Sequence, residues 1–144
     1  MKTELCVLIG AVGAFFTSLL GGWDTSLAAL CIFMGVDYIT GLLCAGVFHK
    51  SPKSKTGALE SKASFKGLVR KSVVLLIVLM AHYLDLVIGI SYVRDAVCIA
   101  FIVSEAISIT ENAGLMGVPV PPRLIKAIEL LQQKNEDKGG DKDE

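Results

Sequence analysis

Residues 73–90 read "VVLLIVLMAHYLDLVIGI", an apolar run in which His82, Tyr83 and Asp85 are the polar interruptions. A helix rises about 1.5 Å per residue, so this run covers about 27 Å, close to the roughly 30 Å hydrocarbon core of a bilayer. The whole chain has 53% hydrophobic and 19% charged residues, with a mean hydropathy of +0.61. These values are too apolar for an ordinary soluble domain and predict an all-α integral membrane protein.

Three further runs approach the same length, so four transmembrane helices are predicted at about 5–22, 25–48, 72–90 and 93–111. The short turns within each pair predict two tight hairpins. The first run could instead be a signal peptide, but Glu4 interrupts the basic start and no Ala-x-Ala site precedes Trp23. The fourth run is the least apolar because it contains Glu105. It could therefore be a partly inserted segment, or one that spans only when partners cover it.

The segment 49–71 between the second and third spans is strongly basic and is predicted to be a loop. It contains seven basic residues against one acid, Glu60; the basic residues are Lys50, Lys53, Lys55, Lys62, Lys66, Arg70 and Lys71. Positive charge is retained on the cytoplasmic side of membranes, so this loop and both chain termini are predicted to be cytoplasmic. A patch for anionic lipid is an alternative use of the same charge. Nucleic-acid binding is not expected, because the segment has one phenylalanine and no series of stacking aromatics.

The transmembrane domain is predicted to cover residues 1–113, and two further segments follow it. Residues 114–133 contain prolines and then an amphipathic pattern in which Leu124, Ile128 and Leu131 share one face, which indicates a helix on the membrane surface or against a neighbouring subunit. Residues 134–144 mix both signs of charge around a glycine pair and are predicted to be a disordered tail.

Polar residues inside the spans are the candidate functional positions, because a charge near the centre of a membrane helix costs roughly 2.5–3.5 kcal/mol. Helical spacing groups them into stripes: Asp37, Thr40 and Gly41 on the second span, Glu105, Ser108 and Asn112 on the fourth, and His82 with Asp85 on the third, where the two can meet. Each stripe could simply bridge helices of one monomer. For Glu105 a contact between subunits or a pore lining is the preferred interpretation.

A wide aqueous path must lie between subunits, because helices of one small bundle pack about 8–10 Å apart. On the first span Gly10, Ala14 and Ser18 repeat every four residues and would allow close approach of another helix, either within the chain or in a homo-oligomer.

No catalytic or metal-binding arrangement emerges, so neither an enzyme nor a cofactor is expected. The four cysteines lie singly in apolar runs, and no phosphate-binding loop or His-Glu-x-x-His motif is present.

Four pieces of the sequence carry a resemblance: "DYITGLLCAG" (37–46), "SFKGLVRK" (64–71), "YLDL" (83–86) and "SEAISITENAGLMGVPVPPRL" (104–124). The last is the most specific, because an acidic residue late in a span is followed by Glu-Asn and a Gly-x-Pro-x-Pro turn. Together they make residues 30–131 similar to the holins of phage lysis and clostridial toxin secretion. The family pattern falls on Asp37, Gly41, Gly67, Arg70, Lys71, Asp85, Glu105, Glu111, Asn112, Gly117, Pro119 and Pro121.

The resemblance implies a multi-pass protein of the bacterial cytoplasmic membrane that oligomerises and opens lesions, through which an endolysin or a toxin leaves the cell. An antiholin would be a further possible partner. Many such proteins end in a strongly basic segment, whereas residues 134–144 have three lysines against five acids. The rival interpretations are a small ion- or solute-selective channel or transporter, with His82 and Asp85 or Glu105 as a proton relay, and a structural membrane scaffold.

Overall fold

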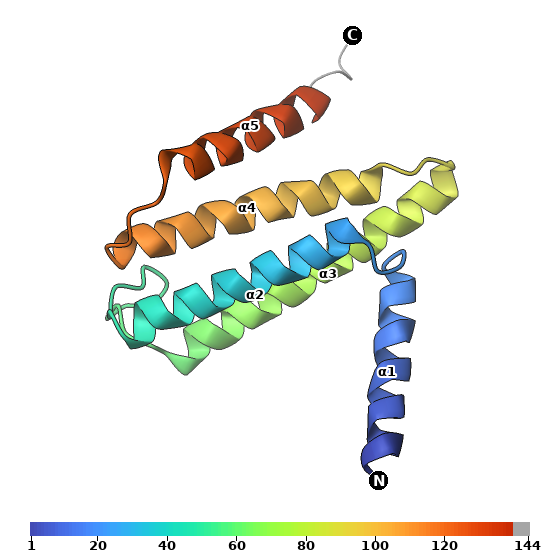
Figure 1. Ribbon diagram of the computed structural model, residues 1–144, viewed down its shortest axis with the longest axis horizontal. Helices are drawn as coiled ribbons and strands as arrows, with labels where there is room; N and C mark the ends of the chain where they lie inside the picture. The colour runs from blue at the N-terminus through green and yellow to red at the C-terminus, as the bar shows by residue number, and fades with distance from the viewer. Residues whose placement is uncertain (140–144) are drawn as a thin grey trace.

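The computed structural model describes residues 1–139, which form five helices and contain no strand. The helices are α1 (Lys2–Leu19), α2 (Thr25–Gly46), α3 (Ser61–Ile88), α4 (Val93–Leu115) and α5 (Pro122–Gly139) (Figure 1). The predicted all-helical fold is therefore confirmed.

Three of the helices, α1, α2 and α3, are long and apolar enough to cross a membrane. Helix α4 has 23 residues and therefore enough length, but it carries Arg94, Asp95, Glu105 and Glu111 and does not meet the same criterion of composition. The fourth span accordingly stays a prediction, and it depends on how these charges are satisfied.

The centre of the molecule is a bundle of α2, α3 and α4, in which the largest interface joins α2 to α4 (Figure 1). Its apolar core consists of Leu30, Met34, Val74, Val78 and Cys98. These residues recur at spacings of four along α2 and along α3, so each helix buries one stripe and leaves its other apolar side chains exposed. Such an exposed apolar surface suits lipid as the surrounding solvent.

Helix α1 leaves this bundle and contributes no buried residue to it (Figure 1). The prediction of two tight hairpins is therefore wrong for the first pair, since α1 does not pack along α2. The turn between them contains Gly21 and Gly22, both with φ of +90°, and this left-handed backbone directs α1 away from the bundle. The second hairpin forms as predicted: Gly89 ends α3 in a left-handed conformation, and α4 begins at Val93 and packs on α3.

Helix α3 begins at Ser61, so the last part of the segment predicted as a basic loop, residues 61–71, is helical. This part contains one glycine, Gly67, and no proline, whereas Pro52 and Gly57 lie before Ser61. With 28 residues, α3 is about 42 Å long and exceeds the hydrocarbon thickness by about 12 Å. Its basic first turns can therefore extend into the headgroup region.

Helix α5 begins at Pro122, a residue suited to the first turn. It runs back beside α4, and the buried Ile128 packs against Val103 and Ala106 of that helix (Figure 1). The helix continues to Gly139, so the predicted disorder is wrong for residues 134–139, where no proline or glycine interrupts the chain before Gly139. The remaining residues of the predicted tail, 140–144, lie outside the described residues.

Candidate functional site

A buried charge network lies at the meeting point of α2, α3 and α4. The Lys71 ammonium donates to Asp37 Oδ2 at 2.8 Å and to Glu105 Oε2 at 2.6 Å. All three side chains are largely buried, with exposed fractions of 13% for Lys71, 7% for Asp37 and 12% for Glu105. One cation from α3 thus joins carboxylates from α2 and α4.

Asn112 and Thr40 extend this network toward the end of α4. Asn112 Nδ2 donates to Thr40 Oγ1 at 3.1 Å and to Asp37 Oδ1 at 3.4 Å. The Thr40 hydroxyl donates to the Asp37 carbonyl oxygen at 3.0 Å. Gly41 lies beside this contact, since a Cβ there would be 3.8 Å from Asn112 Nδ2. We call Asp37, Thr40, Lys71, Glu105 and Asn112 the Lys71 network.

The predicted polar stripes of the second and fourth spans therefore meet, and Lys71, which the sequence placed in a loop, joins them. With one cation and two carboxylates, the network carries a formal charge of −1 when all three groups are ionised. Pairing offsets the cost of placing each charge away from water, whereas removing one partner of a buried pair commonly costs about 3–5 kcal/mol. The carboxylates are thus tolerable in the monomer because Lys71 lies between them.

A groove of about 560 Å³ opens beside the network between α3 and α4. Lys71, Glu105 and Asp37 line its inner part, together with Ser108 and Ser104. The predicted Glu105–Ser108 stripe therefore borders space large enough for several water molecules or part of a larger ligand.

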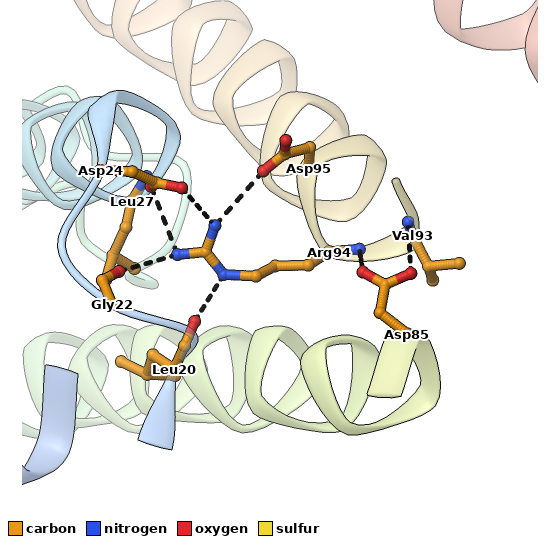
Figure 2. Close-up of polar contacts among 8 residues, drawn as sticks. All are labelled: Leu20, Gly22, Asp24, Leu27, Asp85, Val93, Arg94 and Asp95. Atoms are coloured by element: carbon orange, nitrogen blue, oxygen red, sulfur yellow. Dashed lines mark hydrogen bonds and ion pairs between the residues drawn. The ribbon is translucent and has the colours of Figure 1, made fainter. Parts of the chain in front are cut away.

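A second charge network holds the turn between α1 and α2 against the start of α4 (Figure 2). The Arg94 guanidinium donates to the carbonyl oxygens of Leu20 and Gly22 and to both carboxylate oxygens of Asp24, at 2.6 and 3.3 Å for the latter. It also contacts Asp95 Oδ1 at 3.3 Å. We call Leu20, Gly22, Asp24, Arg94 and Asp95 the Arg94 network.

Asp24 also caps α2, because its Oδ1 accepts a hydrogen bond from the Leu27 N–H at 2.9 Å. Hydrogen bonds from Arg94 hold the pKa of the Asp24 carboxyl below its usual range, against the opposing effect of burial. The sequence did not predict this network. Two features of the sequence could have indicated it. Asp24 stands directly before an apolar run, which is typical of a helix cap, and the charged residues Arg94 and Asp95 stand at the start of another run.

Asp85 does not pair with His82, contrary to the prediction. Its carboxylate instead accepts the backbone N–H groups of Val93 at 3.0 Å and Arg94 at 2.9 Å, and so caps the first turn of α4 (Figure 2). No hydrogen bond or ion pair joins His82 to Asp85 in the described part of the chain. Free N–H groups at a helix start compete better for a carboxylate than a side chain three residues away on the same helix.

The other predicted positions are distributed over the surface. Gly10, Ala14 and Ser18 lie on α1, which has no buried residue. Three of the predicted basic residues, Lys53, Lys66 and Arg70, line the groove beside Lys71, while Lys50, Lys55 and Lys62 are exposed. The motif residues Glu111, Gly117, Pro119 and Pro121 fall at the end of α4 and in the link to α5, where Gly117 has a φ of +78°.

A metal site is not formed by the described residues, since no three His, Cys, Asp or Glu side chains in residues 1–139 gather in a suitable group. The ion pairs of Lys71 and Arg94 show that the arrangement offers charge pairing between helices.

The chain is similar to several proteins over most of their length. It is 34% identical to an uncharacterized protein of Clostridium perfringens, covering 91% of this chain and 94% of the relative. It is 37% identical to an uncharacterized protein of Listeria innocua, covering 93% and 92%. A probable holin of Bacillus phage phi105 is 29% identical over 72% of this chain and 71% of its own.

No solved structure gives a significant match. The model of the bacteriophage holin family matches residues 14–133, which include both charge networks and the start of α5. The chain therefore belongs to the bacteriophage holin family, as its sequence motifs indicated.

Proposed function

We propose that this protein is a holin that oligomerises in the bacterial cytoplasmic membrane and forms lesions through which an endolysin, or in a related setting a toxin, leaves the cytoplasm. The observation that carries the proposal is the Lys71 network, in which carboxylates from two predicted spans are paired within one chain and border a groove between helices. Family membership supports the same function.

In this proposal the network allows the protein to accumulate in the membrane without harm until lesions form. While Lys71 lies between Asp37 and Glu105, each charge has a partner and the helices can remain together in lipid. If α4 separates from α2 and α3, these side chains and Asn112 lose their partners and require water. An assembly of many chains could supply that water as a common lumen, with the polar stripes of α2 and α4 along its wall.

Helix α1 is the element we assign to contacts between subunits. Its apolar side chains are exposed, and among residues 1–139 it makes no extensive contact with another helix. Gly10, Ala14 and Ser18 would let a helix of a second copy approach closely, and a Cβ added at Gly10 would meet no atom of this chain.

The proposed topology places both termini in the cytoplasm and treats α4 as the fourth span. The basic start of α3 then lies at the cytoplasmic surface, and the Arg94 network lies at the opposite surface. The charges of Arg94 and Asp95 sit at the end of α4, where contact with headgroups and water reduces their cost.

The test is release of a folded cytoplasmic reporter enzyme from cells that express the full chain with an endolysin. We expect release of the reporter and lysis, with timing changed in the double variant Asp37→Asn, Glu105→Gln. The matched control is Glu60→Gln, which removes a carboxylate from the loop before α3. Retention of the reporter while small ions cross would instead identify a selective channel. Unchanged timing and lesion size in the double variant would reject the role given to the Lys71 network.

A further inference from the structure

The groove between α3 and α4 is lined by basic residues at one end and by apolar residues along its walls. Its basic residues outnumber its acidic ones. Lys53, Lys66, Arg70 and Lys71 line it with two carboxylates, Asp37 and Glu105, so four positive charges face two negative ones. Lys71 is engaged by both carboxylates. Among the described residues Lys53, Lys66 and Arg70 make no ion pair, and all three are exposed.

The polar and apolar parts of the groove follow one another along α3. Lys66 and Arg70 come first, and Val73, Val74 and Ile77 follow on the same side of the helix, at steps of three and four residues. Lys66 and Ile77 are thus about 16 Å apart along the helix axis. Helix α4 runs antiparallel to α3 (Figure 1). Its Phe101 packs against the core cluster that contains Val74, and so adds to the apolar end of the groove. Charge is therefore confined to the end at which α3 begins.

We infer that this groove binds an anionic phospholipid, with the phosphate at Lys53, Lys66 and Arg70 and one acyl chain along Val73, Ile77 and Phe101. The order of charge and apolar surface matches the order of headgroup and hydrocarbon in a leaflet. The volume of about 560 Å³ falls within the range of about 300–1,000 Å³ common for ligand pockets. The inference rests on the proposed membrane placement of α3, but not on lesion formation.

A lipid bound in the groove would lie directly against the Lys71 network. Glu105 and Lys71 form the inner wall of the groove, directly beside the apolar residues that the acyl chain would cover. An acyl chain in this position excludes water from the paired charges and fills the space between α3 and α4. The lipid would therefore stabilise the closed arrangement of the monomer.

The experiment uses the full chain in phosphatidylcholine vesicles and reads fluorescence quenching by bromine on lipid tails. Trp23 is the sole tryptophan, so Trp23→Phe, Phe101→Trp places one reporter in the groove. We expect stronger quenching by brominated phosphatidylglycerol than by brominated phosphatidylcholine at equal fraction. Adding Lys66→Gln and Arg70→Gln should lower this preference about 25-fold, at about fivefold for each cation.

Controls separate this site from general attraction to a basic surface. Lys50→Gln with Lys62→Gln removes two exposed lysines that do not line the groove, and the preference should change less than twofold. Equal loss in both double variants, or equal quenching by the two lipids, would overturn the inference. Displacement by excess inorganic phosphate would also overturn it, because a free phosphate site needs no acyl chain.

Two further measurements distinguish lipid binding from a folding defect of the variants and from lesion formation. Native mass spectrometry of the unaltered chain in detergent should show retained phosphatidylglycerol, and its absence would count against the site even if Phe101→Trp perturbs the groove. Reporter release from cells reads the proposed holin function separately. Release without lipid preference rejects the lipid site alone.

Discussion

The Arg94 network and the Lys71 network both place a cation between acidic groups of different helices, yet they differ in how the cation is held. The Arg94 guanidinium directs its donors at two backbone carbonyls and a carboxylate. The Lys71 ammonium contacts two carboxylates and borders a groove. A planar guanidinium fixes geometry, whereas an ammonium is a compact charge on a flexible stem. The comparison indicates that the Arg94 network is a rigid connection at one end of the bundle, whereas the Lys71 network at its centre is a contact that can separate.

Replacing Arg94 should have the largest effect on stability. Arg94→Lys keeps the charge but loses the bonds to Leu20, Gly22 and Asp24 that need several donors. We expect a loss of about 3–6 kcal/mol in the free energy of unfolding, because at least two hydrogen bonds from the buried, charged guanidinium are lost, at about 1.5–3 kcal/mol each. Denaturation of the full chain in detergent measures it. An Arg94→Lys protein as stable as the parent would show that the network is no more rigid than the one around Lys71.

Replacing Lys71 should have a smaller effect on stability and a larger one on timing. Lys71→Met leaves Asp37 and Glu105 without their cation. In detergent without added lipid we expect a loss of about 2–4 kcal/mol, somewhat below the usual range because the open groove then admits water. Lysis should begin earlier in cells. Stability is measured as for Arg94, and timing by culture turbidity.

The triple variant Lys71→Met, Asp37→Asn, Glu105→Gln tests whether charge pairing is the cause. It removes all three charges, so most of the lost stability should return. If the triple variant is as unstable as Lys71→Met, the side chain of Lys71 acts through packing and the comparison of two charge networks fails.

The two glycines of the turn between α1 and α2 offer a matched pair of substitutions beside Arg94. Gly21 and Gly22 both have φ of +90°, but a Cβ at Gly21 would lie 2.7 Å from His82 Nδ1 and 2.8 Å from Arg94 Nε, whereas one at Gly22 would meet nothing. Both alanine variants should lose about 1 kcal/mol through backbone strain. Gly21→Ala should lose about 1–2 kcal/mol more, because it must displace Arg94. Equal melting temperatures of the two variants would show that the Arg94 side chain is free to move.

The sequence predicted the helical fold and the positions of most helix ends, because the apolar runs and the glycine turns are local signals. Helical spacing placed Asp37 with Thr40 and Glu105 with Asn112, and the structure brings these four side chains into one network. It did not predict that Lys71 joins these stripes, because the positive charges around it favoured a loop and pairing across helices has no local pattern. The direction of α1 was missed for a related reason. Two adjacent glycines allow the chain several directions between α1 and α2, and the direction adopted depends on contacts with Arg94, more than 70 residues away along the chain.

The smallest expected effect is the pH dependence of the Asp24–Arg94 pair. The folded-state pKa of Asp24 is lowered by Arg94, so the pair contributes stability above the pKa of Asp24 in the unfolded chain, about 3.9. That contribution is lost as the pH falls through the lower folded-state pKa. The Asp24 side chain is 46% exposed, so solvent screening keeps the effect small.

Asp24→Asn isolates the charge, because asparagine can still accept the Leu27 N–H and cap α2. The difference in melting temperature between parent and variant should be constant near neutral pH and should shrink below about pH 4. The other carboxylates titrate equally in both proteins and cancel in this difference. A difference that stays constant down to pH 2 would mean that the Asp24 carboxylate serves the turn only as a hydrogen-bond acceptor, and the rigidity of the connection would then come from the bonds of Arg94 to the backbone carbonyls of Leu20 and Gly22.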